Sequence, residues 1–316
     1  MLTIHWTHKR NWRSLTPMRT RFSRPVPRAL ADAERGRLDD IVDIGRYPIS
    51  DLDSLAGRSL VADTAARLEQ DGLVRLPGLL RPSAVRELRR EMRVTGRYVS
   101  CETTTRSAYA GDETLLAADD PRRLTSTWTA GHITRDMIPP YSVAQRLYVS
   151  PDFKRFIAAC LGLGRVFEYA DPLAGLITTV IPPGGEYGWH YDTNRFVVTL
   201  AVEEARSGGA FEYSPDLRSP GDENLEGLRA VMTGDRSTVR TVTARAGDLQ
   251  LFLGRYSLHR VTRVEGHRPR LMLVLSYAEQ PGIIGPLERT RQVYGRVTET
   301  HLLHAEQALG SDGLIA

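Results

Sequence analysis

Lysine is almost absent from this chain. Lys9 and Lys154 are the only two, so 42 basic residues less two leaves 40 arginines. Because arginine codons are GC-rich, we interpret this skew as the mark of a high-GC bacterial coding sequence rather than as a functional signal. A formal net charge of +4 over 316 residues does not by itself predict nucleic-acid binding.

Cysteine is equally scarce. Cys101 and Cys160 are the only two, which excludes a disulfide-stapled scaffold, and they form no CxxC pair that would predict a zinc ribbon. Such sparse cysteine use is typical of a reducing compartment, so we expect a cytoplasmic protein. No apolar run approaches the roughly 20 residues that a membrane span requires, so we expect no membrane association.

Acidic residues are missing from the first thirty positions, where seven basic residues occur. We predict that residues 1–49 are a basic, poorly ordered leader. An arm for an acidic partner and a transit peptide remain alternative interpretations of the same composition. We expect no nucleic-acid partner, and the sequence gives no indication of oligomeric state.

From residue 50 the composition becomes that of a folded domain, which we predict to extend to residue 316. Apolar residues recur at helical spacing over residues 54–70, a short strand is predicted at 73–76, and a helix follows over 82–94. Another helix is predicted over 142–161, whereas the polar stretch 101–140 shows no clear pattern. We therefore predict a mainly helical part over residues 50–165.

Short β-rich runs then follow at close intervals, with glycine or proline between them. Regular short strands with turn signals are typical of an all-β sandwich or barrel. The predicted fold class is mainly β with flanking helices: a double-stranded β-helix (jelly-roll, cupin-like) core over residues 166–281 and a helical tail over 282–316. The runs are 176–181, 196–202, 209–213, 239–244, 248–253 and 270–277, with one helical insertion predicted at 222–232.

The strongest chemical signal is His190 and Asp192, between two of these runs. Residues two apart in an extended chain point to the same face, so an imidazole and a carboxylate would lie side by side. His259 follows 67 residues after Asp192, and Arg268 nine residues later. Two histidines and one carboxylate form the facial triad of non-haem Fe(II), which leaves coordination positions open for a bidentate co-substrate and O₂. An arginine offers a planar fork for a distant carboxylate.

This pattern resembles the Fe(II)/2-oxoglutarate-dependent oxygenase superfamily. Residues 64–80 resemble its helix–strand opening, and the strings 188–196, 208–213 and 247–261 resemble the branch of free-amino-acid (lysine) halogenases and their hydroxylase relatives. The resemblance covers about residues 50–281. It implies that Fe(II), 2-oxoglutarate and O₂ are used, that His190, Asp192 and His259 are the iron ligands, and that Arg268 holds the far carboxylate of 2-oxoglutarate.

One departure from the branch concerns the reaction. In its halogenases a small residue replaces the ligand carboxylate and chloride takes the vacated position, whereas Asp192 is present here. The resemblance therefore implies hydroxylation of a free amino acid or similar small polar molecule in specialised metabolism. Desaturation, cyclisation or heteroatom oxidation by the same chemistry is an alternative. A jelly-roll regulator that binds metal or ligand without catalysis is another, but it would be expected to lose a ligand.

Several other residues are candidate co-substrate or substrate contacts, each with an alternative interpretation. Arg270 shares strand parity with Arg268, so both are candidates for 2-oxoglutarate, and we favour Arg268 by spacing. Thr193 and Asn194 at the barrel mouth and Ser276 on the Arg270 strand are candidate substrate contacts, although turn or strand chemistry also explains them. Arg123 lies in a stretch that resembles the region where the branch places an arginine on the substrate carboxylate; a surface ion pair is its alternative.

Overall fold

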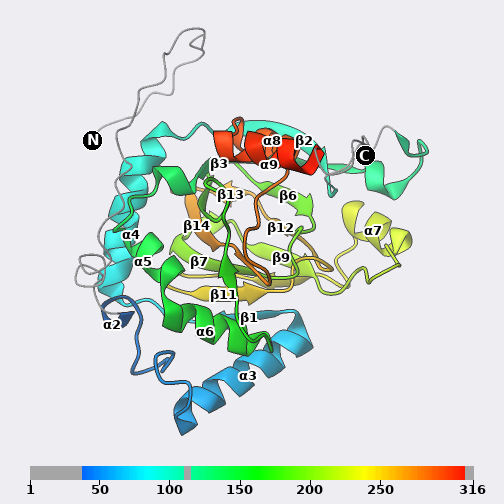
Figure 1. The fold of residues 1–316 in the computed structure, drawn as a ribbon. Helices are drawn as coiled ribbons and strands as arrows, with labels where there is room; N and C mark the ends of the chain where they lie inside the picture. Colours follow the sequence, from blue (N-terminus) through cyan, green and yellow to red (C-terminus); the bar gives the residue numbers. More distant parts are fainter. Residues whose placement is uncertain (1–37, 110–114, 310–316) are drawn as a thin grey trace. The chain divides into compact units, whose positions relative to one another are not determined.

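The computed structural model describes residues 38–109 and 115–309, so most of the predicted leader lies outside the described residues. Two β-sheets form the centre, with helices beside them (Figure 1). The larger sheet has the order β1-β11-β7-β14-β5-β3-β2 and the smaller β10-β9-β12-β6. Their bounds are β1 Leu73–Leu76, β2 Glu102–Ser107, β3 Thr125–Ile133, β5 Leu176–Ile181, β6 Tyr187–His190, β7 Val197–Glu203, β9 Phe211–Ser214, β10 Arg240–Val242, β11 Leu249–Phe252, β12 Leu258–Val261 and β14 Arg270–Leu275.

The eight strands β5, β6, β7, β9, β10, β11, β12 and β14 make the predicted jelly roll. Along the chain they pass from sheet to sheet, so that β11-β7-β14-β5 faces β10-β9-β12-β6. The fold-class prediction is confirmed. Short strand pairs close the edges: β8 (Ser207–Gly208) with β13 (Val264–Glu265), and β4 (Phe167–Glu168) with β15 (Tyr277–Ala278).

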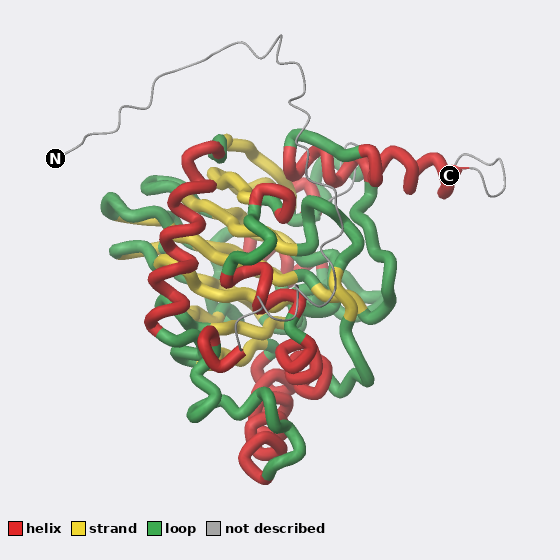
Figure 2. The backbone as a smooth tube through the Cα atoms, turned by 60° about the vertical axis from the view of Figure 1, so that its left-hand side comes forward, coloured by secondary structure: helices red, strands yellow, loops and turns green. Residues whose placement is uncertain are grey.

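Alternation along β7 shows how the larger sheet is used on both faces. Val198, Leu200 and Val202 are fully buried against the helices, whereas Val197 and Thr199 point into the space between the sheets. The main apolar core therefore lies between the outer face of this sheet and a helical layer (Figure 2). That layer contains α2 (Leu38–Ile41), α3 (Leu55–Asp71), α4 (Pro82–Thr95), α5 (Val143–Val149) and α6 (Pro151–Cys160).

Three segments differ from their predicted structure. The single helix predicted over 142–161 is two helices, because Pro151 has no N–H to continue α5 and Ser150 caps α6 by accepting from the Phe153 N–H. The unassigned stretch 101–140 forms β2 and β3, which extend the larger sheet. Residues 38–49, predicted as leader, contribute Ile41, Val42 and Ile49 to the core.

The predicted insertion helix is α7 (Leu225–Met232), and the tail holds α8 (Leu287–Tyr294) and α9 (Glu299–Leu309). Single 3₁₀ turns occur at Gly96–Tyr98, Pro121–Arg123 and Arg135–Met137. Among the described residues no helix is long and apolar enough to cross a membrane.

A fully buried carboxylate attaches the tail to the core. Asp171 accepts backbone N–H bonds from Leu173, Ala174 and Gly285 at 2.7–2.9 Å, and its Oδ2 lies 3.1 Å from Nε2 of His301. Burial alone would raise the Asp171 pKa, but these hydrogen bonds outweigh it and lower the pKa. The carboxylate thus joins the approach to β5 with α9.

We expect Asp171→Ala to lower the free energy of unfolding by about 3–5 kcal/mol, because it leaves buried donors without an acceptor. Urea denaturation followed by circular dichroism measures this loss. Asp53→Ala is the matched control: Asp53 pairs with Arg155 at 2.8 Å, but its side chain is 91% exposed, so we expect a loss of at most about 1 kcal/mol. Equal losses in the two variants would contradict the role of Asp171.

Candidate iron centre

Two histidines face each other across the smaller sheet. His190 ends β6 and His259 lies in β12, where the two residues are direct register partners. Their ring centroids are 3.9 Å apart. Asp192 follows β6 by two residues, and its Oδ1 lies 3.9 Å from Nε2 of His190 and 3.6 Å from Nε2 of His259. The structure thus brings the three predicted metal ligands together.

The second ring nitrogen of each histidine fixes its orientation. Nδ1 of His190 lies 2.9 Å from the carbonyl oxygen of Gly188, and Nδ1 of His259 lies 2.9 Å from that of Ser257. Because a carbonyl oxygen only accepts, both Nδ1 atoms carry the proton and donate. In the neutral form of each ring, Nε2 then carries the lone pair on the side of Asp192, and this is the tautomer that a metal ion requires.

Burial sets the charge states of the cluster. Burial and the neighbouring His259 lower the pKa of His190 to about 3, so His190 is neutral at physiological pH. Burial alone would raise the pKa of Asp192, but His259 and His190 outweigh it and the pKa is lowered. A neutral His190 beside an ionised Asp192 suits the donor set that Fe(II) prefers in a facial triad.

Asp192 also carries an unsatisfied atom. Its Oδ2 is buried and has no hydrogen-bond partner among the described residues. A buried, unpaired carboxylate oxygen is costly, and a cation held between Asp192, His190 and His259 would relieve that cost. The ligand atoms lie within 4.8 Å of one another. The residues present therefore fit an iron ion.

A cavity of about 180 Å³ lies between the two sheets and includes the triad. Arg270 lines it, is 8% exposed, and forms no ion pair with any residue that the structure describes. Burial lowers the pKa of Arg270 to about 10. Nε2 of Gln250, in the same cavity, is buried and has no hydrogen-bond partner within residues 38–109 and 115–309. A buried guanidinium and a free amide donor fit the far carboxylate of 2-oxoglutarate.

The two candidate arginines are placed differently. β14 begins at Arg270, so the strand parity invoked for Arg268 does not extend to it. The Arg268 side chain is 41% exposed and lies 3.9 Å from Glu203. Arg268 does not line the cavity, so this geometry favours Arg270 and not the Arg268 that we preferred from spacing.

None of the predicted substrate contacts lines this cavity. Asn194 accepts a short hydrogen bond from the Tyr169 hydroxyl, and Thr193 is exposed, with its carbonyl accepting from Arg255 at 2.6 Å. Ser276 lies between β14 and β15, where its carbonyl accepts from the Tyr148 hydroxyl. Arg123 is exposed and donates to the Leu116 carbonyl at 3.0 Å.

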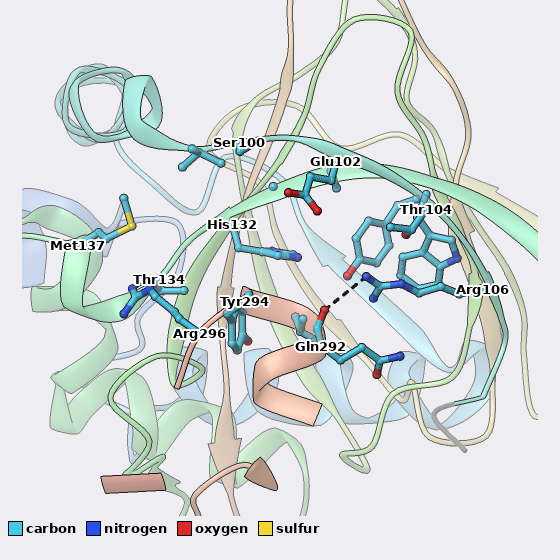
Figure 3. A pocket seen from close by; sticks show the side chains of 17 residues that line it. Ser100, Glu102, Thr104, Arg106, His132, Thr134, Met137, Gln292, Tyr294 and Arg296 are labelled. Carbon is cyan, nitrogen blue, oxygen red and sulfur yellow. Dashed lines mark hydrogen bonds between the residues drawn. The ribbon is translucent and has the colours of Figure 1, made fainter. Parts of the chain in front are cut away.

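A second cavity of about 270 Å³ adjoins the first, and we call it the annex. Tyr187 lines both cavities, and Trp128 lines the annex while its ring packs 4.9 Å from that of His190. In Figure 3 the imidazole of His132 lies between Glu102 and Tyr294, with Arg106 opposite. Nδ1 of His132 has no partner among the described residues, and burial with nearby Arg106 lowers its pKa to about 4.

The annex residues were not predicted from the sequence. Glu102, Arg106 and His132 come from the stretch 101–140, where β2 is polar at every position and so shows no alternation of apolar and polar side chains. Alternation of Glu102, Thr104 and Arg106 was the available signal, since these three residues share one face of β2.

The family model described as Halogenase D matches residues 56–290. No curated protein matches the chain. Similar solved structures include a 2OG-Fe(II) oxygenase family oxidoreductase from Burkholderia pseudomallei, at 19% identity and a TM-score of 0.46, covering 70% of this chain and 92% of that chain. A Pseudomonas putida prolyl-4-hydroxylase matches at 18% identity and a TM-score of 0.42, covering 68% of this chain and 96% of that chain. The epimerase SnoN from nogalamycin biosynthesis matches at 16% identity and a TM-score of 0.48, covering 70% of this chain and 83% of that chain.

The family match spans well over half of the chain and includes the whole jelly roll and the histidine–aspartate–histidine cluster. The cluster and the cavity beside it fit the iron and 2-oxoglutarate that such enzymes use. The chain therefore belongs to the Halogenase D family of Fe(II)/2-oxoglutarate-dependent oxygenases.

Proposed function

We propose that this oxygenase hydroxylates a small polar substrate and does not chlorinate it. Asp192 carries this proposal, because its carboxylate stands at the corner of the triad that chloride occupies in the lysine halogenases that the sequence resembles. Oδ1 of Asp192 lies within 3.9 Å of both histidine Nε2 atoms, so the carboxylate is directed toward the metal position. An anion from solution would have to displace it.

The residues around the centre have separate tasks. Iron, with 2-oxoglutarate and O₂, supplies the oxidation that replaces a substrate C–H bond with C–OH. His190, His259 and Asp192 hold the metal, and Arg270 with Gln250 orients the co-substrate through its far carboxylate. Phe252 and Phe211 pack at 4.8 and 5.5 Å from the His259 ring and exclude water from that side.

The annex supports a substrate that carries both charges, such as a free amino acid. Neither Glu102 nor Arg106 forms an ion pair among the described residues; Arg106 donates to the Gln292 carbonyl at 3.4 Å and lies 5.8 Å from the centroid of the Trp128 ring. An ammonium and a carboxylate would match these two side chains, and Trp128 and Tyr187 form an aromatic wall. Tyr187 lines the iron cavity as well as the annex. We therefore propose that the substrate keeps its charged groups in the annex and extends past the Tyr187 ring, so that the carbon to be oxidised lies in the iron cavity.

We expect the iron-loaded protein to form a product 16 mass units heavier than its substrate, and no chlorinated product even in high chloride. An anaerobic titration with Fe(II), 2-oxoglutarate and then each of the protein amino acids identifies a substrate by the shift of the charge-transfer band. Mass spectrometry of the aerobic reaction then reads the outcome. A chlorine isotope doublet would overturn the proposal, and loss of two mass units would indicate desaturation.

We expect Arg270→Ala to raise the apparent 2-oxoglutarate constant at least about tenfold, because a charge-assisted bidentate contact is worth about 1.5–3 kcal/mol. Arg268→Ala is the matched control and should leave the constant unchanged, since Arg268 lies outside the cavity. Anaerobic titration of 2-oxoglutarate into the Fe(II) protein measures both. The reverse pattern would return the role to Arg268.

For the amino acid found in the panel, we expect Arg106→Ala to raise its KM at least about tenfold and to leave the 2-oxoglutarate constant unchanged. Arg67→Ala, which removes an exposed arginine of α3, should change neither constant. If no amino acid shifts the band, or if Arg106→Ala binds the responding amino acid normally, the annex is not the substrate site.

A further inference from the structure

Gly254 lies directly against the third ligand. It is buried just after β11, and its carbonyl accepts the Asp192 N–H at 3.1 Å. A Cβ built on Gly254 would stand 1.9 Å from Oδ2, 2.7 Å from Cγ and 3.0 Å from Cβ of Asp192. The three nearest atoms thus all belong to this one side chain. The Asp192 carboxylate therefore occupies the space that a side chain at position 254 would need.

The backbone does not explain the glycine. Gly254 is absent from the glycines with positive φ, in contrast to Gly247, which precedes the same strand with a φ of +95°. An alanine at position 254 is therefore compatible with the local conformation. What opposes a side chain there is contact with Asp192.

The two backbone segments are tied together, so the side chain must yield. Besides the Asp192–Gly254 bond, Arg255 donates to the Thr193 carbonyl at 2.6 Å, and the Leu253 N–H donates to the Gly72 carbonyl at 2.8 Å. A carboxylate two bonds from the backbone moves away by rotation about χ1, which costs far less than moving these paired strands. Rotation would carry Oδ1 away from the histidines.

We propose that Gly254 is a positioning residue that fixes the Asp192 carboxylate as the third metal ligand, so that positions 192 and 254 act as one determinant of that ligand. A side chain at 254 is incompatible with a coordinating carboxylate at 192, but compatible with a glycine there. The inference rests on the proposed function in taking His190, Asp192 and His259 as the metal site.

Cobalt(II) titration of the full-length apo-protein, followed by calorimetry, tests this without turnover. We expect Gly254→Ala to weaken Co(II) binding by about 10–100-fold, the range typical when the support of a metal ligand is lost. Asp192→Gly should weaken binding comparably. The double variant should bind within about twofold of Asp192→Gly, because without the carboxylate the alanine has nothing to displace.

Gly164→Ala is the matched control, since its Cβ would meet no atom within 4 Å and its φ is ordinary. It should bind Co(II) as the wild type does, and all variants should keep the wild-type apo unfolding midpoint within a few degrees. Wild-type affinity in Gly254→Ala would overturn the proposal, as would losses that multiply in the double variant. If His190→Ala and Asp192→Gly also bind normally, the metal site itself, and with it the proposed function, fails.

Discussion

The pairing of β6 with β12 is the constraint on which the site depends. It sets His259 directly opposite His190, and the two rings approach to 3.9 Å without any residue between them. Both Nδ1 atoms donate to carbonyls two residues earlier in the chain, so the backbone itself selects the ligating tautomer. A shift of one residue in this register would turn one imidazole to the opposite face of the sheet.

Polar groups are left unsatisfied where ligands are expected to bind. Nε2 of Gln250 and the guanidinium of Arg270 have no protein partner among the described residues, and neither has Oδ2 of Asp192; all three residues line one cavity. Asp171, which is fully buried, instead accepts hydrogen bonds from three backbone N–H groups and lies 3.1 Å from His301. This contrast distinguishes a binding site from a structural contact. Binding of iron and co-substrate would offset the cost of burying the unpaired cavity groups, so the free energy of unfolding would rise with the concentrations of these ligands.

Family membership and reaction are different conclusions for this chain. The Halogenase D match extends over the jelly roll, but a fold does not fix the reaction, which in the proposed function is decided at one corner of the triad. Asp192 fills that corner, and Gly254 provides the space for it. In the proposed function, substrate selection depends on other elements, because residues of β2, β3 and the end of α8 line most of the annex.

The sequence by itself determined the jelly roll and the identities of the clustered residues, since both follow from local patterns: alternating apolar strands, His190 two residues from Asp192, and His259 after a buried strand. It did not determine which arginine enters the cavity, because the start of β14 at Arg270 is set by pairing with β5 and β7. Nor did it show the annex or the contact of Gly254 with Asp192. The annex joins residues as far apart in the sequence as Val99 and Arg296, and Gly254 follows Asp192 by 62 positions, so only tertiary packing decides which side chains share a space.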